Sequence, residues 1–256
     1  MALLEIKGVS KYFGGLAALN DFDMEINEGE IRGLIGPNGS GKTTLYNVIS
    51  GVYRPTSGTI VYQGEEISHL PPSVIAKKGL VRTFQHTALF MDFTVLQNIS
   101  VGRHLHAREN VFGVVGSTVA TKKVEKDALK KAEEIVDFME LTHLKDELAI
   151  NLPHGYMRAL GVGITLATEP KLLMLDEPVT GMNPTEKVHM LGLINRIRER
   201  GITVLLVEHD MRTVMGLCDY ITVLNFGKKL AEGTPKEIQA HDEVIEAYLG
   251  KAEILG

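Results

Sequence analysis

A glycine-rich segment that follows an apolar run constrains the fold of this chain more than any other feature. Residues 36–44 read Gly-Pro-Asn-Gly-Ser-Gly-Lys-Thr-Thr, which fits the pattern G-x-x-x-x-G-K-[ST]. The glycines let the backbone wrap closely, so that several N–H groups point at one phosphate group. Ile31–Ile35 predicts a strand before the segment, and Thr43–Ile49 predicts a helix whose positive end lies at the same place. The sequence therefore predicts a phosphate-binding loop between a strand and a helix.

The loop also carries side chains suited to phosphate chemistry. The ammonium group of Lys42 is expected to neutralise β- and γ-phosphates, and the Thr43 hydroxyl is expected to ligate Mg²⁺. The residues expected to contact the phosphates are Gly36, Pro37, Asn38, Gly39, Ser40, Gly41, Lys42, Thr43 and Thr44.

Short apolar runs alternate with longer amphipathic segments along the chain. Apolar strands between helices are typical of a buried, parallel sheet, whereas runs joined by glycine-containing turns indicate antiparallel pairing. We therefore expect an α/β fold with a mainly parallel sheet and an antiparallel β portion. The parallel strands are expected at Ile31–Ile35, Leu80–Phe84, Leu172–Leu175 and Thr203–Val207, and the antiparallel portion at Leu3–Val9, Gly58–Gln63 and Tyr220–Glu232.

The long span between Phe84 and Leu172 contains no convincing strand pattern. Within it, Lys122–Glu140 places apolar residues on one face at helical spacing. The span is therefore expected to form a helical subdomain inserted into the sheet. Another helix is expected after Asn183, which can cap it, and before Gly201, which can terminate it.

Two predicted strands end in clusters of polar residues. Asp176 and Glu177 follow Leu172–Leu175 directly, at the edge where α/β sheets bind ligands. Asp176 is expected to hold Mg²⁺ directly or through water, and Glu177 to face an attacking water. The alternative is a strand end with two solvated acids. His209 follows Thr203–Val207 and is a candidate donor to a γ-phosphate, although a lone histidine is more often structural.

Composition limits the classes of partner and location. The chain of 256 residues has 27 Lys+Arg and 32 Asp+Glu, a net charge of −5. This balance provides no global positive field for nucleic acid, and none is expected as a partner. The single cysteine, Cys218, excludes an intrachain disulfide and fits a reducing compartment. No run is long and apolar enough for a membrane span, so any work at a membrane would require docking on another protein.

In combination, these motifs resemble the nucleotide-binding subunit of an ATP-binding-cassette (ABC) transporter, over essentially the whole chain. The resemblance implies ATP with Mg²⁺, Glu177 as general base and His209 as a γ-phosphate contact. It places Tyr12 against adenine, although Tyr12 alone would be judged a core or edge aromatic. Gln85 matches a glutamine that senses Mg²⁺ and the attacking water. A nucleotide-binding core of residues 1–85 and 170–256 and a helical subdomain of residues 86–169 are implied.

Within the family, several segments resemble the branched-chain amino-acid importer group, in particular the longer of its two ATPase subunits. The group also handles urea and short amides. The implied assembly has a second ATPase subunit in a head-to-tail dimer, two membrane-spanning subunits and, indirectly, a solute-binding protein, with this chain peripheral on the cytoplasmic face of the membrane. The segments are Phe84–Gln85, Thr94–Ile99, Val101–His104, Thr180–Pro184 and Val244–Gly250.

The loop that would contact the partner's ATP departs from the family pattern Leu-Ser-Gly-Gly-Gln. Pro153 replaces the serine and offers neither a hydroxyl nor a backbone N–H. Tyr156 replaces the glutamine, and the following helix, Met157–Thr168, contains two unfavourable glycines. We expect a weakened composite site on the partner's ATP. This signature loop consists of Leu152, Pro153, His154, Gly155 and Tyr156.

Other functions compete with the importer. A lipid or lipopolysaccharide exporter ATPase has a similar pattern, but the C-terminal tail and the Thr94–Arg103 region favour the importer. Soluble ABC ATPases that act on ribosomes or DNA usually fuse two cassettes or insert a coiled coil. A kinase or GTPase with the same phosphate loop is disfavoured, because the order of Gln85 and His209 fits neither and no Asn-Lys-x-Asp sequence is present.

Overall fold

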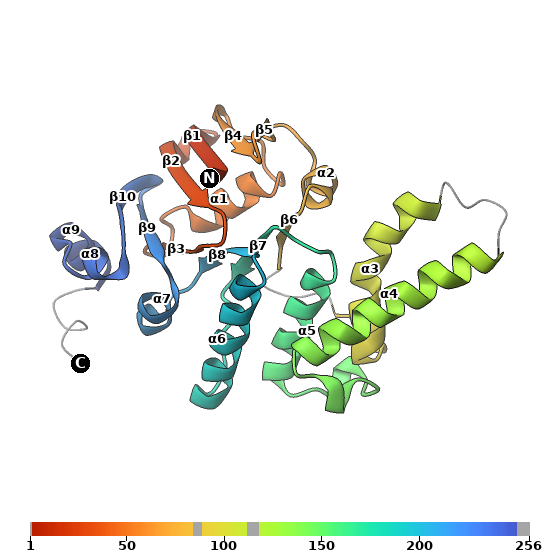
Figure 1. The fold of residues 1–256 in the computed structure, drawn as a ribbon. Helices are drawn as coiled ribbons and strands as arrows, with labels where there is room; N and C mark the ends of the chain where they lie inside the picture. The colour runs from red at the N-terminus through yellow and green to blue at the C-terminus, as the bar shows by residue number, and fades with distance from the viewer. Residues whose placement is uncertain (1, 84–88, 112–117, 250–256) are drawn as a thin grey trace.

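The strands of the computed structural model form two sheets, with helices between them and below them (Figure 1). The structure describes residues 2–83, 89–111 and 118–249, of which 104–111, 118–125 and 248–249 are described as backbone only. The expectation that concerns Gln85 therefore lies outside the described residues.

A six-stranded sheet runs through the middle of the molecule (Figure 1). Its strand order is β10-β9-β3-β8-β7-β6. All pairs are parallel except β9 with β10. The strands are β3 (Ile31–Ile35), β6 (Leu80–Arg82), β7 (Leu172–Asp176), β8 (Thr203–Val207), β9 (Tyr220–Asn225) and β10 (Lys228–Gly233). The predicted parallel sheet is thereby confirmed for the described residues.

The central strands are apolar because both of their faces are buried. Side chains alternate between two cores, since successive residues of a strand point to opposite faces. Leu172 and Met174 of β7 pack into the core shared with the antiparallel sheet, whereas Leu173 and Leu175 pack among the helices below. This double burial explains why the runs lack alternation of polar and apolar residues.

A second sheet is antiparallel, with the order β2-β1-β4-β5. Its strands are β1 (Ala2–Phe13), β2 (Leu16–Asn27), β4 (Ser57–Tyr62) and β5 (Glu65–Glu66). The helix α1 (Lys42–Ile49) lies between the two sheets, and its Leu45, Tyr46 and Ile49 share a core with both (Figure 1). The sequence predicted one antiparallel portion, and this prediction was wrong for one of its three segments. Tyr220–Glu232 belongs to the central sheet, because β9 pairs in parallel with β3.

The span before β7 is helical in its described parts, as the sequence predicted. Its elements are α3 (Val95–Val111), α4 (Thr118–Phe138), the short 3-10 turns Thr142–Leu144 and Ala149–Asn151, and α5 (His154–Leu166). Gly163 of α5 serves close packing, since a Cβ at this position would lie 3.2 Å from Ile99 of α3. A Cβ on Gly102 would lie 2.4 Å from the carbonyl oxygen of Ile164. One glycine from each helix, Gly102 of α3 and Gly163 of α5, therefore allows the two helices to approach one another.

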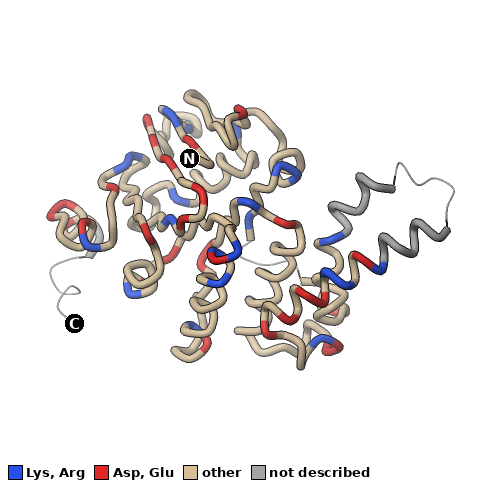
Figure 2. Tube along the Cα trace, in the orientation of Figure 1, with Lys and Arg blue, Asp and Glu red and all other residues tan. Residues whose placement is uncertain are grey.

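The remaining helices flank the sheets. Asn183 caps α6 as predicted: its side chain accepts from the Glu186 N–H, and the Glu186 carboxylate accepts from the Asn183 N–H. Figure 2 shows acidic and basic residues interleaved along α4 and α6. No helix among the described residues combines the length and the apolar composition that a membrane span requires. The helices that flank the sheets are α2 (Pro72–Lys77), α6 (Pro184–Glu199), α7 (Met211–Leu217), α8 (Pro235–Gln239), α9 (Asp242–Val244) and the π-helical turn Ile245–Leu249.

Candidate nucleotide site

A cavity of about 480 Å³ lies where the phosphate loop meets the ends of β7 and β8. Its polar lining comes from that loop and those strand ends, and its apolar lining comes from the β1–β2 connection and the β9–β10 turn. The lining residues are Phe13, Leu16, Ala17, Ala18, Asn38, Gly39, Ser40, Gly41, Lys42, Thr43, Thr44, Asp176, Glu177, Val207, His209, Phe226 and Gly227. The topology thus brings together most of the residues that the sequence singled out.

The phosphate loop has the close backbone packing that its glycines predict. A Cβ on Gly36 would lie 2.1 Å from the carbonyl oxygen of Leu224, and one on Gly41 would lie 2.5 Å from that of Ala18. Gly41 also has φ 113°, which disfavours any other residue. The buried hydroxyl of Ser40 has no hydrogen-bond partner among the described residues. A buried polar group of this kind is suited to a ligand that enters the loop.

Lys42 is folded back onto the loop that carries it. Its Nζ donates to the carbonyl oxygens of Gly36 at 2.6 Å and Pro37 at 2.9 Å. Burial lowers the pKa of Lys42, and the carboxylates of Glu177 and Asp176 partly oppose that shift. A mostly buried ammonium group beside a glycine-rich loop is a strong attractor for an anion.

Asp176 is held by a residue on the neighbouring strand. Its Oδ2 accepts from Arg82 at 2.7 Å, and Arg82 also donates to Asn47 Oδ1 at 2.6 Å. The guanidinium carbon of Arg82 lies 5.2 Å from the centre of the Tyr46 ring. Asp176 is buried, and the side chain of Arg82 is only 11% exposed. Arg82 was not predicted from sequence, because its role depends on the pairing of β6 with β7.

Glu177 and His209 contact one another directly. His209 Nε2 lies 2.9 Å from Glu177 Oε1, and the Thr180 hydroxyl donates to Glu177 Oε2 at 3.3 Å. The backbone of Glu177 is left-handed, with φ 49°, and its N–H donates to Val207 O at 2.9 Å. A left-handed glutamate costs conformational energy and often marks a functional site. The Glu177 carboxylate faces the same cavity as Lys42.

A second acidic residue, Glu208, supports the loops that carry Glu177 and His209. Glu208 is buried, and its carboxylate accepts from the N–H groups of Val179 at 3.0 Å and His209 at 3.3 Å. Burial raises the pKa of Glu208, against the opposing effect of those two N–H groups. The contacts tie the loop after β7 to the loop after β8. The position of Glu208 in the polar cluster after β8 was the only sequence signal for this role.

The aromatic residue that β1 contributes to the cavity is Phe13. Phe13 lines the cavity, whereas its neighbour Tyr12 is not among the lining residues. Adjacent side chains of a strand point to opposite faces, which accounts for the presence of only one of the two in the lining. The Tyr12 hydroxyl lies 3.5 Å from Asn20 Oδ1. The Phe13 ring packs edge-on against Tyr53, with 5.3 Å between ring centres.

The signature loop lies at the start of α5, away from the lining of this cavity. Leu152 is buried, and Pro153 occupies the N-cap position without a side-chain hydrogen bond. Tyr156 packs edge-on against His143, with 5.6 Å between ring centres. Gly155 lies so close to Glu186 that a Cβ would be 2.9 Å from its carboxylate. The loop therefore packs against the start of α6 within this chain.

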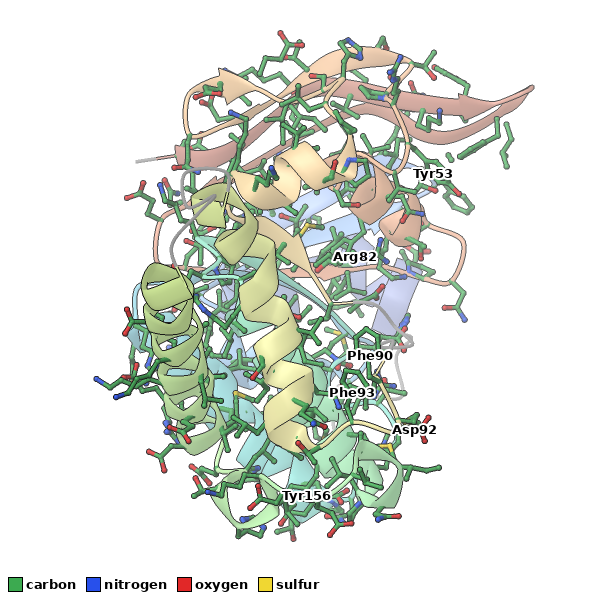
Figure 3. All side chains as sticks on the ribbon, turned by 90° about the vertical axis from the view of Figure 1, so that its right-hand side faces the viewer. Tyr53, Arg82, Phe90, Asp92, Phe93 and Tyr156 are labelled. Carbon is green, nitrogen blue, oxygen red and sulfur yellow. The ribbon has the colours of Figure 1, made fainter. Side chains whose placement is uncertain are left out.

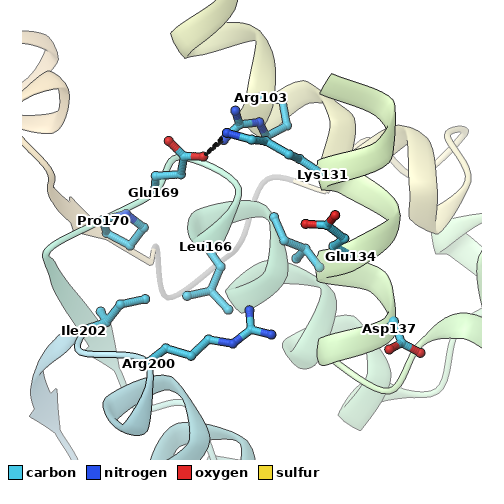
Figure 4. Close-up of a pocket in the computed structure, with 10 residues that line it drawn as sticks. Arg103, Lys131, Glu134, Asp137, Leu166, Glu169, Pro170, Arg200 and Ile202 are labelled. Atoms are coloured by element: carbon cyan, nitrogen blue, oxygen red, sulfur yellow. Dashed lines mark hydrogen bonds and ion pairs between the residues drawn. The ribbon is translucent and has the colours of Figure 1, made fainter. Parts of the chain in front are cut away.

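A larger hollow of about 580 Å³ lies on another part of the molecule, between α4, α5 and the end of α6 (Figure 4). Arg103 on its wall donates to Glu169 at 2.8 Å, and Lys131 contacts the same carboxylate at 2.8 Å. The hydrogen bond from Lys131 lowers the pKa of Glu169. Arg103 and Lys131 are therefore already paired with an acid, whereas Lys42 donates to backbone carbonyl oxygens.

Comparison with known proteins agrees with this geometry. The profile of the ABC transporter family matches residues 19–180, and that of the branched-chain amino acid ATP-binding cassette transporter matches residues 228–254. The chain is 42% identical to the high-affinity branched-chain amino acid transport ATP-binding protein BraF of Pseudomonas aeruginosa, over 98% of each chain. It is 41% identical to the corresponding LivG protein of Escherichia coli K12, also over 98% of each chain.

Solved structures give the same result. An ATP-binding cassette of an ABC transporter in its ADP conformation superimposes with a TM-score of 0.84 and 31% identity, covering 98% of this chain and all of the other. A nucleotide-free cassette superimposes with a TM-score of 0.83 and 30% identity over the same shares. The match covers both sheets and the helical span. This chain belongs to the family of ATP-binding, ATP-hydrolysing subunits of ABC transporters.

Proposed function

We propose that this chain drives an importer for branched-chain amino acids or a related small solute such as urea or short amides. The observation that carries the proposal is the convergence of Lys42, Asp176, Glu177 and His209 on one cavity, in a chain whose relatives are named for branched-chain amino acid transport. The match of residues 228–254 to a branched-chain amino acid transporter profile favours this solute class over an exporter.

In the proposed mechanism, the loop of residues 36–44 wraps the phosphates of ATP. Lys42 turns from the carbonyls of Gly36 and Pro37 to the β- and γ-phosphates, since an anion is a stronger partner than a neutral carbonyl. The unpartnered Ser40 hydroxyl supports this fit. Glu177 accepts the proton of the attacking water, and His209 donates to the γ-phosphate.

Mg²⁺ fits the same cavity. Among the described residues, no group of three or more His, Cys, Asp and Glu is arranged to bind a metal alone. Mg²⁺ in phosphate-transfer sites instead uses one or two protein oxygens together with phosphate oxygens and water. Thr43 and Asp176 line the cavity and would hold it, with Gln85 as a further expected contact. The bound ion would neutralise charge on the phosphates.

We further propose that ATP closes a head-to-tail dimer with a second ATPase subunit. Each ATP would lie between the phosphate loop of one subunit and the signature loop of the other. The position of the signature loop outside the lining of this chain's own cavity supports an action on the partner's ATP. Closure would move residues 86–169 relative to a core of residues 1–85 and 170–256.

The surface proposed to meet the membrane subunits is the loop before α3. Phe90 and Phe93 are exposed and stack on one another, with 5.1 Å between ring centres. The buried Asn98 amide donates to both of their carbonyl oxygens and fixes the loop. Figure 3 shows both rings on the same side of the molecule as Tyr53. Such docking would keep the chain peripheral on the cytoplasmic face of the membrane, with the solute-binding protein contacted only indirectly.

The function is tested by transport in proteoliposomes. The chain would be reconstituted with the membrane subunits and second ATPase that copurify with it, and uptake of labelled leucine, urea and acetamide compared. We expect ATP-dependent uptake that Lys42→Ala abolishes and that Lys126→Ala, a change of an exposed lysine on α4, leaves intact. ATP hydrolysis without uptake of any of these solutes would contradict the importer assignment.

The docking surface is tested separately. Phe90→Ser with Phe93→Ser should reduce copurification of the membrane subunits while ATP binding by the isolated chain is unchanged. Val188→Ser, on an exposed part of α6, serves as the control for loss of an exposed apolar side chain. Copurification that is equal in all three proteins would place the contact elsewhere.

A further inference from the structure

The β9–β10 turn presents an aromatic ring to solvent in a strained conformation. Phe226 is 85% exposed and has φ 45°. The following Gly227 has φ 75°, so the two-residue turn has positive φ at both positions. Turns of this type favour Asn and Gly, because a bulky residue at positive φ is costly. Exposure of a phenyl ring to water adds a second cost. At 85% exposure, the ring gains little packing from the described residues to offset either cost.

The turn is held firmly beside the phosphate loop. The Gly227 N–H donates to Ser40 O at 2.8 Å, and the Gly227 carbonyl accepts from the Asn20 N–H at 2.8 Å. A Cβ on Gly227 would lie 2.9 Å from the carbonyl oxygen of Ala18. The backbone that carries Phe226 is therefore fixed to the phosphate loop on one side and to β2 on the other.

Phe226 lines the cavity in which the phosphate loop lies. The largest apolar side chains of that cavity are Phe13 and Leu16 of the first hairpin and Phe226, and both rings are substantially exposed. An apolar, aromatic lining suits a flat heterocycle, whereas the remaining lining suits phosphates. The cavity thus has two aromatic residues, Phe13 and Phe226.

We propose that Phe226 is a nucleobase-binding residue, which covers the adenine together with Phe13. The inference rests on the proposed placement of ATP in this cavity. The strained, exposed ring then gains its packing only when a nucleotide is bound. Binding energy from this contact acts on the base and not on the phosphates, so it contributes to affinity for ATP without assisting the transfer step.

The test compares two ligands that differ in the base. Phe226→Asn removes the ring and favours the left-handed turn, so its melting temperature should equal or exceed that of the unmodified chain. We expect its Kd for ATP to rise about tenfold, while its Kd for Mg-tripolyphosphate, which lacks a base, stays unchanged. Phe226→Tyr should retain the affinity for ATP, and Val188→Ala should change neither ligand.

Two results would overturn the proposal. An unchanged Kd for ATP in Phe226→Asn would show that the ring does not contact the base. An equal loss for ATP and tripolyphosphate would show that the turn acts through the phosphate loop and its contact with Ser40. Failure of the unmodified chain to bind either ligand, or binding that is insensitive to Lys42→Ala, would count against the placement of ATP instead.

Discussion

The guanidinium of Arg82 lies 2.7 Å from the carboxylate of Asp176, and this largely buried ion pair joins the end of β6 to the end of β7. The same guanidinium contacts Asn47 of α1 and the ring of Tyr46. Arg82 therefore connects the helix after the phosphate loop with the acid expected to hold Mg²⁺. The next residue, Thr83, also contacts Asp176: its hydroxyl accepts from the Asp176 N–H at 3.3 Å.

Loss of Arg82 should destabilise the fold. Arg82→Ala leaves Asp176 as an unpaired, buried carboxylate, which typically costs about 3 kcal/mol or more in the free energy of unfolding. Asp176→Asn should cost less, and the double variant should lose less than the sum of the two. Urea denaturation of all four proteins gives the coupling energy, expected at about 1–3 kcal/mol. Additive losses would mean that the two groups do not stabilise one another.

Glu177 and His209 should behave as one unit in hydrolysis. Glu177→Gln removes the proposed general base and should reduce turnover by about 10²-fold or more, while ATP still binds. His209→Ala should also reduce turnover, and the double variant should be little worse than Glu177→Gln alone, because residues that act together are not additive. Steady-state hydrolysis and equilibrium ATP binding measure the two effects. Multiplicative losses would indicate independent roles.

We predict that Phe13 contributes more to ATP binding than Tyr12 does. Phe13→Ala should weaken ATP binding by about tenfold, since an aromatic contact contributes about 0.5–1.5 kcal/mol beyond buried area. Tyr12→Ala should change the Kd by less, because Tyr12 does not line the cavity. The two residues are adjacent and similarly exposed, so each variant is a control for the other. The reverse order of effects would support the role of Tyr12 expected from sequence.

The signature loop should limit the rate of ATP hydrolysis at the partner's ATP site. Pro153→Ser with Tyr156→Gln supplies the missing hydroxyl and should increase ATP turnover by the assembled complex. The serine can also cap α5, where Pro153 makes no side-chain hydrogen bond, whereas loss of Tyr156 removes its contact with His143. Turnover of the isolated subunit is the control and should not rise. An unchanged turnover in the complex would mean that this loop is not limiting.

Much of this architecture could be predicted because it depends on local patterns. Leu172–Leu175 is apolar throughout and Ile31–Ile35 is apolar except for Arg32, since each strand is buried on both faces, and the capping box of Asn183 lies within four residues. The strand β2 was not predicted, although Phe22, Met24 and Ile26 alternate with polar residues and face the core. Tyr220–Glu232 was predicted in the wrong sheet, because the pairing partner of a strand is not encoded locally.

The features of the site that escaped prediction depend on contacts between distant segments. Arg82 meets Asp176 only because β6 and β7 are neighbours, and Gly227 meets Ser40 only because β9 lies beside β3. The choice of Phe13 over Tyr12 at the cavity follows from the orientation of β1, which two adjacent aromatic residues do not reveal. The strain at Phe226 likewise depends on the turn geometry. The sequence does not indicate this geometry, because Phe226 stands where such a turn favours Asn.

The contact between Asp210 and Lys187 should make stability depend on pH. The Asp210 carboxylate caps α7 and accepts from Lys187 Nζ at 2.8 Å. The hydrogen bond from Lys187 is the main cause that lowers the pKa of Asp210 below its ordinary value of 3.8. A lowered pKa means that the folded state favours the charged form. The stabilisation that this contact provides is therefore present at a pH above the ordinary pKa of the carboxylate. It is lost as the pH falls through the lowered pKa.

Asp210→Asn tests this dependence because asparagine keeps the helix cap and removes the charge. The variant should be less stable than the unmodified chain at about pH 7, and the difference should vanish as the pH falls below the lowered pKa. Asp210→Ala should lose about 1 kcal/mol more at every pH, since it also removes the cap. Urea denaturation across this range measures both effects. Lys187→Met should reproduce the loss seen in Asp210→Asn, and a loss that does not change with pH would mean that the ion pair contributes nothing.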